Sequence, residues 1–72
     1  MKLTPHHRVG QNICRLRNKS VWTQEQLAEK AEISRRYLQR IESGERNPTV
    51  DILTRLRGAL DCSWNDLFEG VS

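Results

Sequence analysis

Four hydrogen-bonding side chains share one face of a short helix that the sequence predicts over residues 35–43. They are Arg35, Arg36, Gln39 and Arg40, which we call the basic face. Arginine can donate two hydrogen bonds to O6 and N7 of guanine, and glutamine can pair with N6 and N7 of adenine. The spacing therefore predicts contacts to the base edges of duplex DNA. The alternative is a solvated helix face that binds nothing.

A second short helix, predicted over residues 24–31, precedes the basic face and is joined to it by a tight turn. Such a pair forms a helix-turn-helix, in which a brace helix supports a recognition helix whose first turn enters the major groove. The start of the brace helix also suits a phosphate group, because its free N–H groups and positive dipole end favour an anion. The predicted phosphate contacts are Thr23, Gln24, Ser34, Ser43, Arg46 and Asn47.

Cap residues mark the starts of the predicted helices. Thr23 is followed three residues later by Gln26, which is the spacing of a capping box. Thr4 and Thr49 also fit helix starts, and Gly44 fits a helix end. The predicted helices cover residues 5–19, 24–31, 35–43, 50–60 and 64–68.

Apolar residues recur at the helical period of 3.6, so the sequence predicts an all-α fold, a compact five-helix domain over residues 1–72. Its expected core consists of Val9, Ile13, Leu16, Leu27, Ala28, Ala31, Ile33, Leu38, Ile41, Val50, Leu53, Leu56, Leu60, Cys62, Leu67 and Phe68. Trp64 is expected to cover part of this core. Ile52 lies off the main stripe of its helix, so we expect it to be exposed and to hint at a subunit contact.

Charge is distributed unevenly along the chain. Residues 1–22 carry five basic side chains and no acidic one, whereas residues 49–72 carry four acids and two bases. The five bases are Lys2, Arg8, Arg15, Arg17 and Lys19. This asymmetry suggests a polyanionic partner near the basic end, with ordinary solvated charge as the alternative.

Several function classes find no support in the composition. Cys14 and Cys62 are far apart, which favours a reducing cytoplasm over a disulfide framework. Without a His/Cys cluster we expect no metal, and no motif indicates another cofactor or a small-molecule ligand. No apolar run exceeds two residues, which argues against a membrane span. No nucleophile–base pair or paired carboxylates are evident, so we do not expect an enzyme.

Taken in order, several segments resemble the Cro/lambda-repressor type of helix-turn-helix domain, the XRE family. They are ICRLR at 13–17, TQEQLA at 23–28, IS at 33–34, IESGERNPT at 41–49, AL at 59–60 and LF at 67–68. The resemblance covers about residues 8–69. It implies a five-helix domain that binds operator DNA, usually as a homodimer on a two-fold-related site. It also implies a partly buried ion pair between Arg17 and Glu42, with a structural role.

Three residues depart from the family pattern. Val21 and Glu32 stand where the family often has glycine, and a non-glycine residue in the left-handed conformation costs about 1 kcal/mol or more. We therefore expect each turn to be either strained or slightly different in geometry. Arg57 replaces a small apolar residue, which affects the packing expected near the end of the chain.

The sequence thus predicts a sequence-specific DNA-binding transcriptional regulator, most simply a repressor that occupies promoter DNA. A phage repressor, a restriction-system controller and an antitoxin could all use such a domain. The alternative is a protein-interaction or coactivator-type module with the same fold. That alternative predicts a recognition helix without base-edge donors, and the basic face argues against it.

Overall fold

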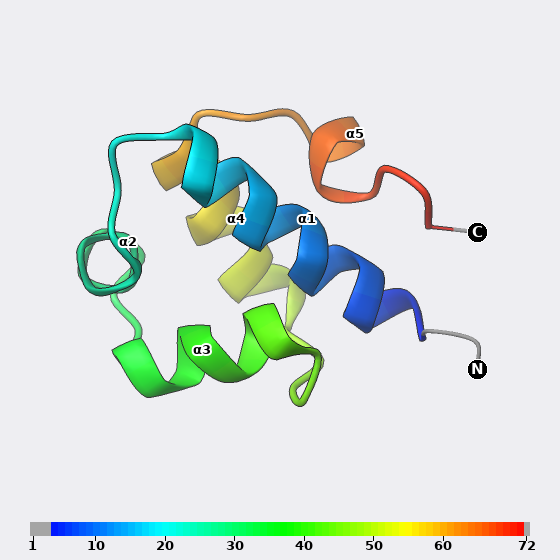
Figure 1. The fold of residues 1–72 in the computed structure, drawn as a ribbon, viewed down its shortest axis with the longest axis horizontal. Coiled ribbons are helices and arrows are strands. Elements are labelled where there is room, and N and C mark those ends of the chain that lie inside the picture. The colour runs from blue at the N-terminus through cyan, green and yellow to red at the C-terminus, as the bar shows by residue number, and fades with distance from the viewer. Residues whose placement is uncertain (1–3, 72) are drawn as a thin grey trace.

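Residues 4–71, which the computed structural model describes, contain five α-helices and no strand (Figure 1). The helices are α1 (Pro5–Lys19), α2 (Gln24–Lys30), α3 (Arg35–Ser43), α4 (Val50–Leu60) and α5 (Trp64–Leu67). The predicted all-α, five-helix fold is therefore confirmed. Lys2, one of the predicted basic residues, lies outside the described residues.

Each helix begins at a serine or threonine whose hydroxyl oxygen accepts a backbone N–H three residues further on. These N-caps are Thr4, Thr23, Ser34, Thr49 and Ser63. The capping box of Thr23 and Gln26 is confirmed, and Ser63 and Asp66 form a second one. Hydrogen bonds from Ser63 lower the pKa of the Asp66 carboxyl group. Because capping residues satisfy N–H groups that a helix leaves free, these sequence positions determine where the helices start.

Helix α1 lies at the centre of the fold, with α4 behind it and with α3 and α5 on opposite sides (Figure 1). Helix α2 packs against α3 and α4. The largest completely buried apolar side chains come from all five helices and are Ile13, Leu27, Leu38, Ile41, Leu56 and Leu67. Among residues 4–71, no helix has the length and apolarity needed to span a membrane.

Three predictions about burial were wrong. Val50 is 74% exposed, because it is the first residue of α4 and lies a turn before that helix enters the core. Phe68 is 40% exposed, since α5 ends at Leu67 and Phe68 caps it. Ile52, predicted to be exposed, is partly buried and packs against the core. Helices α2 and α5 each end one residue earlier than predicted.

One buried polar side chain holds the end of the chain in place. Asn12 is 1% exposed, and its amide nitrogen donates to the carbonyl oxygens of Leu67 at 2.7 Å and Glu69 at 2.8 Å. Asn12 lies on α1, so these bonds fix α5 and the following residues against that helix. A helix as short as α5 cannot be stable alone and depends on such anchoring.

Arg57 is accommodated by an aromatic ring. Its guanidinium carbon lies 5.1 Å from the centroid of the Trp64 ring, a distance suited to a cation–π contact. The Trp64 ring also stacks on Phe68, with 6.1 Å between the ring centroids. Trp64 covers Arg57 in this way and remains 38% exposed itself.

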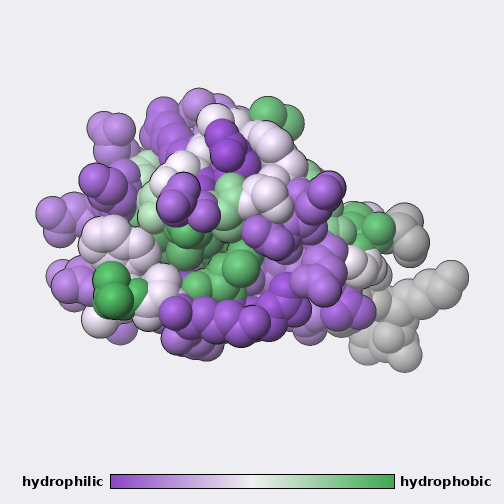
Figure 2. All heavy atoms as spheres, turned by 90° about the horizontal axis from the view of Figure 1, so that it is seen from above, coloured by the Kyte–Doolittle hydropathy of each residue, from purple (hydrophilic) through white to green (hydrophobic). Residues whose placement is uncertain are grey.

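Seen from the side opposite α3, the surface shows apolar residues in a hollow framed by hydrophilic ones (Figure 2).

The two positions that lack the family's glycine behave differently. Glu32 adopts the left-handed conformation, with φ 60°, so the turn between α2 and α3 carries backbone strain. Val21 is not among the residues with positive φ, so the turn before α2 has a different geometry instead.

Candidate nucleic-acid interface

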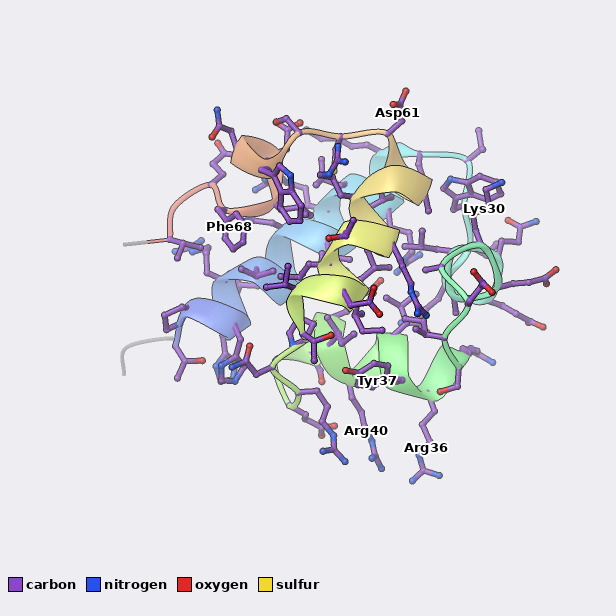
Figure 3. The ribbon with its side chains drawn as sticks, turned by 180° about the vertical axis from the view of Figure 1, so that it is seen from behind. Lys30, Arg36, Tyr37, Arg40, Asp61 and Phe68 are labelled. Carbon is purple, nitrogen blue, oxygen red and sulfur yellow. The ribbon has the colours of Figure 1, made fainter. Side chains whose placement is uncertain are left out.

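The basic face is exposed on the outer side of α3. Arg35, Arg36 and Gln39 are exposed, and Arg40 is half-buried. Figure 3 shows the side chains of Arg36 and Arg40 extending from α3 away from the rest of the molecule. On the opposite side of the helix, Leu38 is completely buried. Helix α3 therefore presents guanidinium and amide donors to solvent while its apolar side is fixed in the core.

A partly buried ion pair connects α3 to α1. Arg17 on α1 donates from Nε to Glu42 Oε2 at 2.7 Å and from a terminal nitrogen to Oε1 at 3.0 Å. The two side chains are only 15% and 6% exposed, and the hydrogen bonds to Glu42 raise the pKa of Arg17. Glu42 Oε1 also accepts a bond from Gln24 Nε2 at 3.2 Å. One carboxylate thus joins α1, the start of α2 and the last turn of α3.

Direct contact between the backbones of α1 and α3 also holds the two helices together. A Cβ atom at Gly10 would collide with the carbonyl oxygen of Ile41, so α1 passes directly against α3 at this point. Burial raises the pKa of the neighbouring Cys14 thiol, and Glu42 raises it further. A neutral thiol beside Glu42 adds no second negative charge next to the ion pair.

The predicted phosphate contacts at helix starts are exposed or half-buried, but several of their atoms already have partners. Thr23 Oγ1 accepts from the N–H of Gln26, and Ser34 Oγ accepts from that of Tyr37. Both hydroxyl protons remain free to donate. Gln24 uses one amide hydrogen on Glu42 and retains the other. These residues can therefore still donate to a phosphate oxygen.

The remaining predicted contacts, Ser43, Arg46 and Asn47, are exposed in and after the last turn of α3. The hydroxyl of Ser43 donates to the carbonyl oxygen of Arg40 at 3.1 Å, and a contact to phosphate would have to replace that bond. Gly44 reverses the chain with φ 85°, and a Cβ atom there would collide with the ring of His7. Glycine is thus favoured at this turn by its left-handed conformation, and any other residue would also have to displace the His7 ring.

One residue of this surface, Glu45, was not predicted from the sequence. Glu45 lies in a shallow recess of about 320 Å³ together with part of the basic face. The recess is lined by Arg36, Gln39, Arg40, Ser43 and Glu45. The glycine before Glu45 indicates that the chain turns there. The sequence alone does not indicate toward which side of α3 the following loop folds. Only the folded loop shows that a carboxylate stands beside the arginines.

Two short helices, a tight turn and an exposed basic face define a helix-turn-helix DNA-binding protein. A helix-turn-helix family model matches residues 15–67. The chain belongs to that family, in its Cro/lambda-repressor (XRE) type, and is a DNA-binding transcriptional regulator.

Relatives in sequence support this assignment. An uncharacterized HTH-type transcriptional regulator of Sinorhizobium fredii, y4dJ, is 42% identical over 59 residues, which are 82% of this chain and 77% of that protein. The immunity repressor protein of Bacillus phage phi105 is 48% identical over 52 residues, which are 72% of this chain. This chain spans 36% of the length of the phage repressor.

Solved structures share the fold. The restriction-modification controller protein C.AhdI from Aeromonas hydrophila superposes with a TM-score of 0.83 at 32% identity, over 88% of this chain and 96% of that one. The wild-type restriction-modification controller protein C.Esp1396I gives a TM-score of 0.80 at 32% identity, over 92% of this chain and 86% of that one.

Proposed function

We propose that this chain is a sequence-specific repressor that binds a two-fold-related operator as a homodimer in the cytoplasm. Each copy acts as one DNA-binding domain and places the start of α3 in a major groove. The observation that carries this proposal is the exposed basic face on a helix whose other side is locked to α1 and α2. A rigid helix holds its donors in a fixed geometry, which base recognition requires.

The proposed roles follow the chemistry of each group. Arg35, Arg36 and Gln39 contact base edges, and Arg40 reaches a base edge one turn further along α3. Phosphate contacts come from Thr23, Gln24, Ser34, Ser43, Arg46 and Asn47, and they fix the position of the domain on the duplex. Repression follows from occupancy, because bound protein excludes other proteins from the same DNA. The similarity to a phage immunity repressor supports this direction of regulation.

For the dimer, we propose that a second copy of this chain covers the aromatic pair of Trp64 and Phe68. The longest dimension of the domain is 32 Å, so in a two-fold dimer joined at one end of this axis, equivalent points midway along the two copies lie about 32 Å apart. That separation matches the roughly 34 Å between half-sites one helical turn apart. In Figure 1, α2 lies at one end of this axis and α5 lies toward the other.

The dimer contact is expected to be weak without DNA. The two side chains are 38% and 40% exposed, and a fully buried aromatic side chain contributes only about 150–250 Å². Burying the exposed fractions in two copies would fall far short of the roughly 1,200 Å² of a stable interface. We therefore propose that the dimer assembles on the operator.

Selection of bound fragments from random duplex DNA, followed by sequencing, tests the proposal. The expected result is an inverted repeat whose half-sites lie about 34 Å or a multiple apart. Enrichment of a single unrepeated site would contradict dimeric binding. Absence of any enriched sequence would contradict specific recognition and favour the protein-interaction alternative.

A further inference from the structure

The loop after α3 places a carboxylate beside the basic face. The backbone N–H groups of Glu45 and Arg46 both donate hydrogen bonds to the carbonyl oxygen of Arg40, at 2.9 and 3.3 Å. This fold-back sets Glu45 Oε2 3.9 Å from Nε of Arg40. Glu45 is the one acidic residue among those that line the recess on α3.

A contribution to folding stability does not explain why a carboxylate stands at this position. The two side chains are 35% and 66% exposed, and solvent screens an ion pair of this kind so strongly that it contributes little to folding. Near DNA the same charge is unfavourable, because it faces phosphate groups of equal sign. A charge that adds little to the fold and is repelled by phosphate can instead affect the choice of DNA sequence.

We propose that Glu45 is a specificity-determining residue, an inference that rests on the proposed DNA-binding function. Its carboxylate holds the guanidinium of Arg40 over the recess, away from the phosphate backbone. Arginine has five N–H donors in a fork, so Arg40 can keep Glu45 as a partner while it contacts a base edge. On DNA that offers Arg40 no base partner, the charge of Glu45 is left facing the duplex, and binding is weakened.

The substitution Glu45→Gln tests this inference, because it removes the charge and preserves the shape. Dissociation constants are measured on the selected operator and on a random duplex of equal length over a range of salt concentrations. We expect tighter binding to the random duplex, with a salt exponent larger by about 0.9 as Arg40 becomes free to neutralise one phosphate. The ratio of operator to random affinity should fall by about fivefold or more, the smallest discrimination that one good base contact provides.

A matched control comes from α4. Asp51 pairs with Arg55 at 3.0 Å in an exposed ion pair and does not line the recess. Asp51→Asn removes the same charge, and we expect it to leave the ratio unchanged. If Glu45→Gln changes the ratio no more than this control does, the inference is overturned while wild-type discrimination still supports the proposed function. A wild-type protein that fails to discriminate would instead overturn the proposed function.

Whether Glu45 acts through Arg40 is tested by combining substitutions at the two positions. Selection with Glu45→Gln should relax preference at one base position, and in an Arg40→Ala background the added Glu45→Gln change should have no further effect on preference. A preference that still changes in that background would mean that Glu45 contacts a base directly, and it would overturn the positioning role.

Discussion

Arg17 and Glu42 form two parallel hydrogen bonds, of 2.7 and 3.0 Å, that tie α1 to the last turn of α3. Both side chains are largely buried, and Gln24 at the start of α2 binds the same carboxylate. The pair therefore fixes the position of the helix that carries the basic face relative to its neighbours. Its contribution to stability can be measured by substitution.

Removal of one partner should be costly. Glu42→Ala leaves the partly buried charge of Arg17 without its counterion, and we expect the free energy of unfolding to fall by about 3 kcal/mol, the lower end of the range for a buried pair. Urea denaturation measures this loss. Glu69→Ala is the control, because it breaks the exposed pair with Arg15 and should cost at most about 1 kcal/mol. Equal losses from the two substitutions would contradict the assignment of Arg17–Glu42 as a buried structural pair.

Asn12 should be needed to keep α5 in place. Asn12→Ala removes two hydrogen bonds and leaves two carbonyl oxygens without their donor, so we expect a loss of about 2 kcal/mol. Hydrogen exchange should accelerate at the N–H of Phe68, which is bonded to the carbonyl oxygen of Trp64. Gln11→Ala, on the exposed side of α1, should change neither quantity. Unaltered exchange at Phe68 in the Asn12 variant would contradict the anchoring role.

The turn between α2 and α3 should become more stable with glycine. Glu32 has φ 60° and is exposed, so Glu32→Gly relieves the backbone strain without loss of packing, and we expect a gain of about 1 kcal/mol. Asp61 has a similar φ of 52°, but aspartate tolerates this conformation better, so Asp61→Gly should gain less. Thermal unfolding compares the two. A loss of stability in Glu32→Gly would show that the carboxylate has a role beyond the turn.

The proposed dimer contact makes a prediction about cooperativity. Trp64→Ala should leave binding to an isolated half-site unchanged and should reduce cooperative binding to the complete operator, since it removes an aromatic ring from the contact. Band-shift titrations on the two duplexes measure both quantities. Val21→Ala changes another exposed apolar residue, 87% exposed and between α1 and α2, and should not alter cooperativity. Undiminished cooperativity in Trp64→Ala would place the dimer contact elsewhere.

Local signals explain why most of the fold could be predicted. N-caps such as Thr23 and Thr49 act through atoms within three residues, so sequence alone indicates where their helices begin. Burial depends instead on how far each helix end extends past the core. Val50 fits the apolar period of α4 and is nevertheless exposed, because nothing packs over the first residue of that helix.

Contacts between distant segments could not be predicted in the same way. Asn12 is polar and lies on a buried surface, and only the folded chain shows the two carbonyl oxygens that satisfy it. Glu45 was missed for a related reason, since its place beside Arg40 depends on a loop that folds back over α3. The exposure of Arg35 and Arg36, in contrast, follows from helical geometry once Leu38 and Ile41 are assigned to the core.

We propose that the basic face recognises bases while the neighbouring loop binds phosphate. Dissociation constants of Arg36→Ala and Arg46→Ala on the operator and on random duplex DNA test it most directly. Arg36→Ala should lose about 1–3 kcal/mol on the operator and much less on random DNA. Arg46→Ala should weaken both and reduce the salt exponent by about 1. Equal losses on operator and random DNA from both variants would contradict the claim.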